Sequence, residues 1–404
     1  MAKPTIRFKG YTEDWEQRKL GDILISLQNN TLSRADLSNE AGVAKNVHYG
    51  DVLIKFGEVL DVSKEKLPMI SDESVLSKYK SSFLQNGDVI VADTAEDSTV
   101  GKCSEIAGLN DEVVLSGLHT IPYRPIEKFA SGYLGYYLNS SAYHNQLIPL
   151  MQGIKVASIS KSAMQDTDIV YPKSVKEQGK IGDYFQSLDH LITLHQRKCE
   201  ETKILKKYML QKMFPQNGQK VPEIRFKCFT EDWEQRKLDD VVEFLDTMRK
   251  PLEGAKRISG SYPYYGASGI VDYVDGYLFD EELILLSEDG ANITDRNYPV
   301  CFLASGKYWV NNHAHVLRTK KENENNFICN SLERKDYTQY NTGMAMPKLN
   351  KETCRKIPIL CPAFEEQQKI GDYFRSLDHL ITLHQRKCEE LKNIKKFMLQ
   401  NMFV

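Results

Sequence analysis

One stretch of the chain occurs twice. Residues 180–201 read KIGDYFQSLDHLITLHQRKCEE, and residues 369–390 repeat this stretch with one change, from Gln186 to Arg375. The separation of the copies is far greater than the roughly 20–50 residues between the units of a solenoid. The chain is therefore expected to contain two large, equivalent parts rather than a stack of small ones.

A second pair of repeats marks where each part begins. IRFKGYTEDWEQRKL at residues 6–20 recurs as IRFKCFTEDWEQRKL at residues 224–238. Each half of the chain thus runs from this opening to a KIGDYF…MF ending. Between these shared ends the sequences of the two halves look unrelated. We call the shared ends the repeated frame and the segments between them the first and second inserts.

The repeated ending has the apolar spacing of a long helix. In the first copy the apolar positions are Ile181, Tyr184, Phe185, Leu188, Leu191, Ile192, Leu205, Tyr208, Met209, Met213 and Phe214. Intervals of three and four place them on one face of a helix on the order of 50 Å long. The second copy repeats the pattern, so the two stripes can pack together as a coiled coil, in which His195 and His384 would set the register.

Each insert is predicted to be a compact α+β module. Short β-rich runs such as NGDVIVADT in the first insert and ELILLSED in the second lie between turn signals, and each insert also contains one helix-like run. The fold class is therefore α+β, with two globular domains joined by two long helices in a duplicated arrangement. The predicted boundaries are residues 1–175 and 218–363 for the two domains and residues 176–217 and 364–404 for the two helices.

Composition limits the classes of function. The 404 residues have a net charge of −2, so the chain lacks the strongly basic balance of a typical nucleic-acid-binding protein. Any role with nucleic acid must rest on local patches or on the charge of a partner. The start has no apolar signal segment, and no run of about 18 apolar residues occurs. The eight cysteines form no CxxC pair. A cytoplasmic protein with reduced thiols is expected.

The search for catalytic motifs gives a negative result. The sequence contains neither a GxxxxGK[ST] phosphate loop nor the Asn/Asp-Pro-Pro-aromatic run that an adenine methyltransferase would need. His313 and His315 could share one face of a strand, but no third metal ligand is evident. The carboxylates of ADTAED and SEDGAN lack the Glu-x-Lys partner of a metal-dependent nuclease and are interpreted as solvated turn formers. No catalytic residue and no metal site is predicted.

Polar and aromatic residues gather in corresponding loops of the two inserts. SGLHTIPYR and VNNHAHVLR place His119 opposite His313 and Arg124 opposite Arg318 in spacing. Side chains of these types pair with base edges and phosphates, although an ordinary polar loop would contain them too. The candidate DNA-contacting residues are Ser116, His119, Thr120, Arg124 and Lys155 in the first insert and Tyr264, Tyr265, Ser268, Asn311, Asn312, His313 and Lys348 in the second.

Over essentially its whole length the chain resembles the DNA-specificity subunits of type I restriction–modification systems. The resemblance rests on the paired FEEQQKIGDYFRSLDHLITLHQRK-type helices, the TEDWEQRKLGDI openings, YPYYGASGIVDYVDGYLF with SEDGAN, and SGLHTIPYRP. The first half departs slightly from the pattern with KEQGKIG, but Ile181 keeps its place. Two divergent inserts in one duplicated frame are the signature of this family.

The resemblance implies a non-catalytic subunit that acts within a larger complex. Each insert would be a target-recognition domain that reads one half of a split site in double-stranded DNA, and the repeated helices would pair antiparallel as a spacer. Two modification subunits would dock on the frames and bring S-adenosylmethionine, and restriction subunits would bring ATP and Mg²⁺. The chain itself would bind no cofactor and no membrane.

Two other classes of function are compatible with parts of the sequence. A stand-alone DNA-binding regulator would need its own basic recognition helix, and a coiled-coil scaffold with two ligand-binding modules would need conventional pockets. Neither feature is visible in the sequence. A self-contained DNA-modifying enzyme is a third option, and it is disfavoured because its catalytic motifs are missing.

Overall fold

The computed structural model describes residues 3–216, 218–254 and 257–404 and divides into two compact units. Unit 1 comprises Met1–His195 and Lys387–Val404, and unit 2 comprises Gln196–Arg386. Residues 1 and 217, which are two of the predicted domain boundaries, lie outside the described residues. Each unit therefore contains one insert together with part of each repeated ending.

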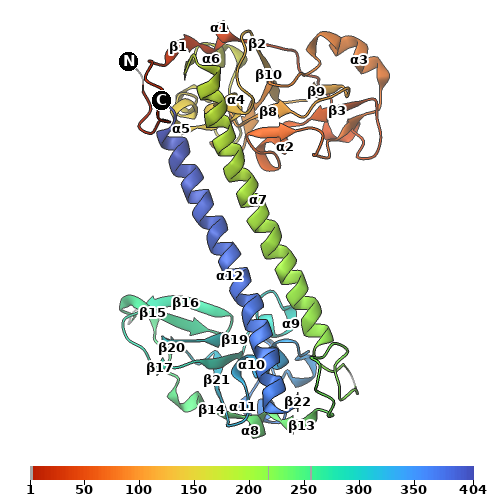
Figure 1. The fold of residues 1–404 in the computed structure, drawn as a ribbon, viewed down its shortest axis with the longest axis vertical. Coiled ribbons are helices and arrows are strands. Elements are labelled where there is room, and N and C mark those ends of the chain that lie inside the picture. Colours follow the sequence, from red (N-terminus) through yellow and green to blue (C-terminus); the bar gives the residue numbers. More distant parts are fainter. Residues whose placement is uncertain (1–2, 217, 255–256) are drawn as a thin grey trace. The chain divides into compact units, whose positions relative to one another are not determined.

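The repeated endings form the two predicted long helices. Helix α7 is Val175–Lys212 and helix α12 is Phe364–Asn401, each of 38 residues. Figure 1 draws each as one continuous helix. At 1.5 Å per residue, such a helix is about 57 Å long. Pro172 and Pro362 precede the helices, and each proline carbonyl accepts a hydrogen bond from a glutamine in the first turn.

Within unit 1, the start of α7 packs antiparallel on the end of α12. The rings of Phe185 and Phe403 stack with centroids 5.7 Å apart, and Lys395 lies 2.6 Å from Asp189. Residue numbers therefore rise along α7 as they fall along α12. Phe185 and Phe403 belong to the core of unit 1, which also includes Ile181, Leu188, Ile192, Cys388 and Leu391.

Unit 2 repeats the same contacts with the equivalent residues of the other copy. The rings of Phe214 and Phe374 lie 6.0 Å apart, and Lys206 lies 2.5 Å from Asp378. The antiparallel pairing expected for the repeated helices is thus confirmed within each unit. The stripe is not buried throughout, because side chains such as Leu205 remain 43% exposed.

The repeated openings also form equivalent structures. Strand β1 (Glu16–Lys19) pairs antiparallel with β12 (Asp168–Tyr171), and β13 (Glu234–Lys237) pairs antiparallel with β22 (Pro358–Cys361). Each opening is then held to the first turn of a long helix by a two-pronged ion pair. Arg7 binds Glu177 at 2.6 and 2.9 Å, and Arg225 binds Glu366 at 2.7 and 2.8 Å.

The central sheet of unit 1 contains five strands. In spatial order they are β2 (Leu24–Ser26), β10 (Thr120–Pro125), β6 (Val89–Ala92), β8 (Cys103–Ala107) and β4 (Val59–Asp61). A smaller sheet consists of β5 (Met69–Ile70), β3 (Ala44–Val47) and β9 (Val114–Ser116). Helix α4 (Tyr133–Asn139) packs its apolar side chains into the core between the sheet and the long helices.

The central sheet of unit 2 has the same strand order over four strands. They are β14 (Val242–Phe244), β21 (Ala314–Thr319), β18 (Leu283–Ser287) and β19 (Cys301–Ala304). A second sheet consists of β16 (Gly269–Val274), β15 (Ser259–Gly266), β20 (Lys307–Val310) and β17 (Phe279–Asp280). Helix α10 (Asn325–Glu333) takes the place of α4 in the core.

The two inserts thus share a topology that their sequences conceal. Thr120 of β10 pairs with Ala92 of β6, and Ala314 of β21 pairs with Ser287 of β18, so the two sheets also share a register. Parallel pairs β3–β9 and β15–β20 complete the correspondence. Many different β-branched and aromatic sequences satisfy one such pleated, half-buried surface. The expected α+β class with two globular parts is confirmed.

Candidate nucleic-acid interface

Corresponding turns precede the central strands β10 and β21. The carbonyl of His119 accepts the N–H of Asp93, and the carbonyl of His313 accepts the N–H of Glu288. These bonds place the two histidines at structurally equivalent positions, as their spacing predicted. Each turn connects the second sheet of its unit, through β9 or β20, to the central sheet, so a rigid scaffold supports it on both sides.

Each of these histidines lies beside an acidic residue whose sequence context predicted only a solvated turn. Nδ1 of His313 lies 2.8 and 3.0 Å from the two carboxylate oxygens of Asp289. Nδ1 of His119 lies 3.5 Å from both Asp93 Oδ1 and Thr94 Oγ1. The side chains of His119 and His313 are 47% and 51% exposed, so each imidazole is accessible to a ligand.

Three further predicted residues of the second insert lie close to His313. Lys348 forms an isolated bridge with Asp289, and its ammonium lies 3.5 Å from Glu288. Asn312 is the exposed neighbour of His313, and Ser268 is exposed at the turn between β15 and β16. The carbonyl of Ala267 accepts the Ser287 hydroxyl at 2.5 Å, which ties this turn to the end of β18. The structure therefore gathers Ser268, Asn312, His313 and Lys348 at one edge.

Several other predicted residues are buried and support these turns from below. The hydroxyls of Ser116 and Thr120 lie 2.6 Å apart, and Thr120 donates to the Gly117 carbonyl. The Asn311 side-chain oxygen accepts the N–H of His313 at 2.8 Å. At most 6% of any of these three residues is exposed, so they fix the turn rather than reach a ligand.

Arg124 and the two predicted tyrosines are also engaged within their units. Arg124 donates to both carboxylate oxygens of Asp88, at 2.6 and 2.9 Å. The Tyr264 hydroxyl accepts the N–H of Leu252, and Tyr265 packs its ring against neighbouring aromatic rings of the core. Lys155 is exposed on a loop.

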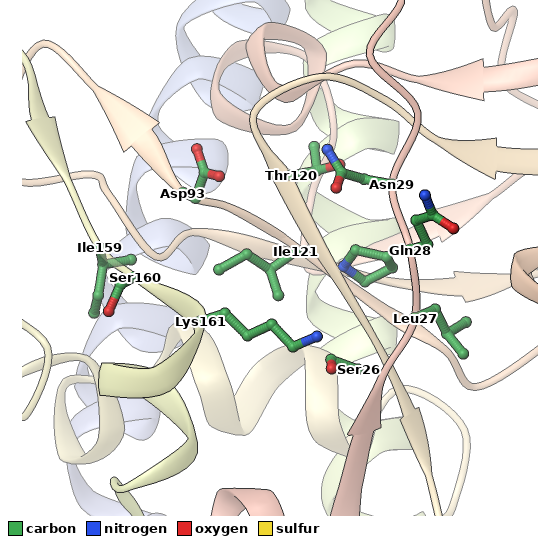
Figure 2. Close-up of a pocket in the computed structure, with 11 residues that line it drawn as sticks. Ser26, Leu27, Gln28, Asn29, Asp93, Thr120, Ile121, Ile159, Ser160 and Lys161 are labelled. Atoms are coloured by element: carbon green, nitrogen blue, oxygen red, sulfur yellow. The ribbon is translucent and has the colours of Figure 1, made fainter.

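Unit 1 also contains a polar pocket of about 460 Å³ that the sequence did not reveal. It lies beside the turn of His119, because Asp93 and Thr120 line it. Figure 2 shows the Lys161 side chain lying across the pocket between Ile121 and Ser26. The remaining lining residues are Leu27, Gln28, Asn29, Pro122, Ile159 and Ser160. Two side-chain amides and one ammonium thus surround a space open to a ligand.

The same place in unit 2 is filled by the protein itself. The backbone pairings align Ser26 with Phe244 and Ile121 with His315. His315 Nδ1 lies 2.8 Å from Asp246, and Nε2 lies 2.7 Å from the Leu349 carbonyl. The ring of Phe244 lies under the ammonium of Lys351, 5.6 Å from the ring centroid.

Burial and hydrogen bonding act in opposite directions on His315. Burial alone would lower its pKa, but the hydrogen bond to Asp246 and interactions with Cys354 outweigh it and raise the pKa to about 10. His315 is therefore a buried cation at neutral pH. Arg249 joins the same network, with a nitrogen 2.7 Å from Glu288.

The two histidines of the HAH motif consequently have separate surroundings. His315 is 1% exposed and lies against Asp246, whereas His313 is half exposed and lies against Asp289. Across residues 3–216, 218–254 and 257–404, no group of three or more acidic, histidine or cysteine side chains could hold a metal ion. This edge presents amide, imidazole and hydroxyl groups for hydrogen bonding, together with the positive charge of a lysine.

Comparison with known proteins assigns the chain to a family. The model of the type I restriction modification DNA specificity domain matches twice, at residues 12–203 and 230–393. These two matches cover the duplicated halves that the repeats define. The chain belongs to the type I restriction–modification DNA specificity family.

Individual relatives agree with this assignment. A type I restriction enzyme specificity subunit of Haemophilus influenzae is 37% identical over 34% of this chain, a match that spans 35% of that protein's length. The MjaX specificity subunit of Methanocaldococcus jannaschii is 24% identical over 95% of this chain and 91% of its own length. The crystal structure of a type I restriction–modification S subunit from M. genitalium has a TM-score of 0.66 at 14% identity, over 100% of this chain and 99% of that one.

Crossing a bilayer requires a helix that is both long and strongly apolar. None of the helices in the described part of the chain combines the necessary length and hydrophobicity.

Proposed function

We propose that this chain is the DNA-reading, non-catalytic component of a cytoplasmic type I restriction–modification complex. Each unit would recognise one half of a bipartite double-stranded site. The observation that carries the proposal is the equivalent placement of His119 and His313 on matching turns of two otherwise divergent inserts, each beside a carboxylate, Asp93 or Asp289. Because the scaffold is shared and the exposed side chains differ, each unit can read its own sequence.

The exposed residues at these edges have the chemistry of base readout. Amide and imidazole groups can donate to and accept from base edges in the major groove, and lysines bind phosphates without sequence information. In unit 2 we assign base contacts to Asn312 and His313 and a phosphate contact to Lys348. In unit 1 the corresponding contacts fall to His119 and to the pocket residues Gln28, Asn29 and Lys161, with Lys155 as a further phosphate contact.

The long helices support a role in docking two identical partners. Leu191 in unit 1 and its repeat equivalent Leu380 in unit 2 are 40% and 41% exposed. Phe397 in unit 1 and its equivalent Tyr208 in unit 2 are 54% and 47% exposed. Each unit thus presents the same pair of exposed apolar positions on its helices. We propose that one modification subunit binds to each unit and brings S-adenosylmethionine, and that restriction subunits bring ATP and Mg²⁺.

The complex can be tested by mapping methylated bases in DNA. We expect no methyl transfer by this chain alone and methylation of one bipartite sequence when the modification subunits are added. Replacing residues 240–356 with those of a relative should then change one half of the site only. Changes in both halves, or methyl transfer by the isolated chain, would contradict the proposal.

A single substitution tests the assignment of base contacts. Asn312→Ala should cost on the order of 1–3 kcal/mol of binding free energy at one base position and relax the preference there. Binding of the full complex to a panel of single-base variants of the site measures this effect. Loss of thermal stability with an unchanged base preference would instead place Asn312 among the residues that only shape the turn.

A further inference from the structure

Each unit carries a short loop at the same place, which we call the tip loop. The tip loops are residues 152–158 in unit 1 and residues 342–348 in unit 2. The N–H of Gln152 donates to the carbonyl of Ser158, and the N–H of Thr342 donates to the carbonyl of Lys348, both at 2.8 Å. The two loops have the same length, although they lie in inserts whose sequences look unrelated.

Glycine at the second position gives both loops their tight fold. A Cβ atom at Gly153 would collide with the carbonyl oxygen of Val156, and one at Gly343 would collide with that of Met346. The chain therefore turns closely around each glycine. We call residues 154–156 in unit 1 and residues 344–346 in unit 2 the tips of these loops.

Each tip carries two exposed apolar side chains. Ile154 and Met344 occupy equivalent positions, and each is 104% exposed. Val156 and Met346 are also equivalent and are 51% and 61% exposed. Single exposed apolar residues are common on protein surfaces, but matched pairs at the ends of two corresponding loops indicate a shared binding role.

Both tip loops are anchored to the candidate recognition edge. The N–H of Ile159 donates to the Asp93 carbonyl at 2.9 Å, and the N–H of Leu349 donates to the Glu288 carbonyl at 2.7 Å. Ile159 and Leu349 are both buried. The loops therefore start from the same strand ends that hold the histidine–carboxylate pairs, and they are continuous with the surface proposed to read DNA.

We propose that the apolar tips act as wedges that insert into the base stack of the half-site read by their own unit. This inference rests on the proposed function. Isoleucine and methionine are residue types that enter between base pairs in DNA-bending proteins. Lys155 and Lys161 near one tip, and Lys348 and Lys351 near the other, supply cations for the adjacent phosphates.

A wedge suits both units because an apolar side chain between base pairs makes no hydrogen bond to a base edge and so requires no particular sequence. An enzyme that methylates a base within a duplex must take that base out of the stack, which costs free energy for unstacking and unpairing. An apolar side chain inserted nearby can replace lost stacking and so lower this cost. Each half-site needs the same help whatever its sequence, which explains why both units carry an exposed apolar tip on a loop of the same length while the surrounding residues differ.

A modification subunit is a less suitable occupant of the tip loops. Two identical partners require two nearly identical surfaces, and the repeated frame provides them. The tips instead differ in side-chain shape and charge, with Ile154, Lys155 and Val156 in one and methionines flanking Ala345 in the other. They also lie at the recognition edge and not on the repeated sequence.

The test uses the full complex with its modification subunits and duplexes that carry 2-aminopurine at successive positions of one half-site. Fluorescence of 2-aminopurine rises when its stacking is lost. We expect Ile154→Ser to weaken binding by roughly tenfold to a hundredfold, the range for burying one side chain of this size, and to abolish the fluorescence rise in the first half-site only. Met344→Ser should do the same in the second half-site.

Two control variants show whether the effect belongs to the tip and to its apolar character. Ile126→Ser changes a side chain that is 60% exposed at the opposite end of β10 from His119, and it should leave binding and fluorescence unchanged. Ile154→Met should retain both signals, because methionine occupies the equivalent tip.

Three results would overturn the wedge or the function on which it rests. If Ile154→Ser retains the affinity and fluorescence of the parent, the wedge does not exist. If it instead prevents binding of the modification subunit without DNA, the tip is a protein-docking surface. If the unaltered complex prefers no half-site at all, the proposed DNA-reading function itself fails.

Discussion

The two units place different side chains at two aligned positions of the same scaffold. In unit 1, Ser26 and Ile121 leave a polar pocket open beside the turn of His119. In unit 2, Phe244 and His315 stand at these positions and fill the space. The strands pair in the same register in both, so the difference lies in the residues that occupy these positions.

One residue of the central strand explains part of this difference. The N–H of Val316 in β21 donates to the Asp246 carboxylate at 3.1 Å. The equivalent residue in β10 is Pro122, which has no N–H to satisfy. Unit 1 therefore needs no acceptor at this point, and Gln28, which follows the same strand as Asp246, is left exposed to solvent. The same scaffold can thus present different surfaces. A polar side chain at one position makes hydrogen bonds within the protein in one unit and is exposed to solvent in the other.

Breaking the buried network should have the largest effect. Asp246→Gln gives unit 2 the side-chain type of unit 1 but leaves His315 without its carboxylate. Removing one partner of a buried ion pair typically costs about 3–5 kcal/mol in the free energy of unfolding. Chemical denaturation followed by hydrogen exchange in β21 measures the loss. The matched change Gln28→Ala in unit 1 should cost less than about 0.5 kcal/mol, because this side chain is exposed. Equal losses in the two units would contradict the comparison.

The same network predicts a pH dependence confined to unit 2. His315 has a folded pKa of about 10, above the ordinary value of 6.5, so the folded unit holds the proton more tightly than the unfolded chain. Its contribution to stability is therefore complete below about pH 6.5 and is lost as the pH rises through about 10, by an amount on the order of 3 kcal/mol. Asp246, Glu288 and Cys354 lie around this imidazole, and Arg249 pairs with both Asp246 and Glu288.

Hydrogen exchange of β21 at pH 6 and pH 9.5 tests this dependence. The parent chain should lose protection at the higher pH, and the variant His315→Leu should show a much smaller change. Strand β10 of unit 1 has Ile121 at the equivalent position and serves as an internal control. A loss of protection in β21 that is the same in parent and variant would assign the effect to other groups.

Filling the pocket of unit 1 should convert it toward unit 2. Ser26→Phe introduces the ring that unit 2 carries at this position, and the open space of about 460 Å³ can accept it without strain. If the pocket contributes to base readout, the affinity for the first half-site should fall by about 1–3 kcal/mol, and the second half-site should be unaffected. Binding to duplexes altered in one half-site at a time, together with a melting curve, distinguishes lost readout from misfolding.

The sequence predicted what the repeats encode and missed what depends on distant contacts. The two long helices and the α+β modules follow from the apolar stripes and the β-rich runs, and the antiparallel packing follows from the family resemblance. The reason for the one difference between residues 180–201 and residues 369–390 is visible only in the fold. Arg375 binds Glu282 and Glu324, at 2.9 and 3.1 Å, and Gln186 faces the Ser131 carbonyl. This residue adapts to the insert that packs on it.

The candidate site was predicted less completely, for a related reason. Residue type and spacing identified the turns of His119 and His313, because both precede a central strand. They did not distinguish exposed from buried members of the set, so Ser116 and Tyr264 were included although each supports its unit from within. The carboxylates of Asp93 and Asp289 were assigned to solvated turns, since the neighbouring strands that bring them to the histidines are distant in sequence.

The smallest effect is expected at the end of the tip loop, where the units differ by one charge. The strand pairings align Lys348 in unit 2 with Ser158 in unit 1. Lys348→Ser should therefore remove one phosphate contact and reduce the salt dependence of binding by about one unit of slope, with every base preference unchanged. Titration of the full complex with DNA at several salt concentrations measures this slope. The reverse change, Ser158→Lys, should increase the slope by a similar amount. An altered base preference in the second half-site would show that Lys348 contacts a base. An unchanged slope would show that Lys348 contacts no phosphate and stays paired with Glu288, 3.5 Å away, when DNA is bound.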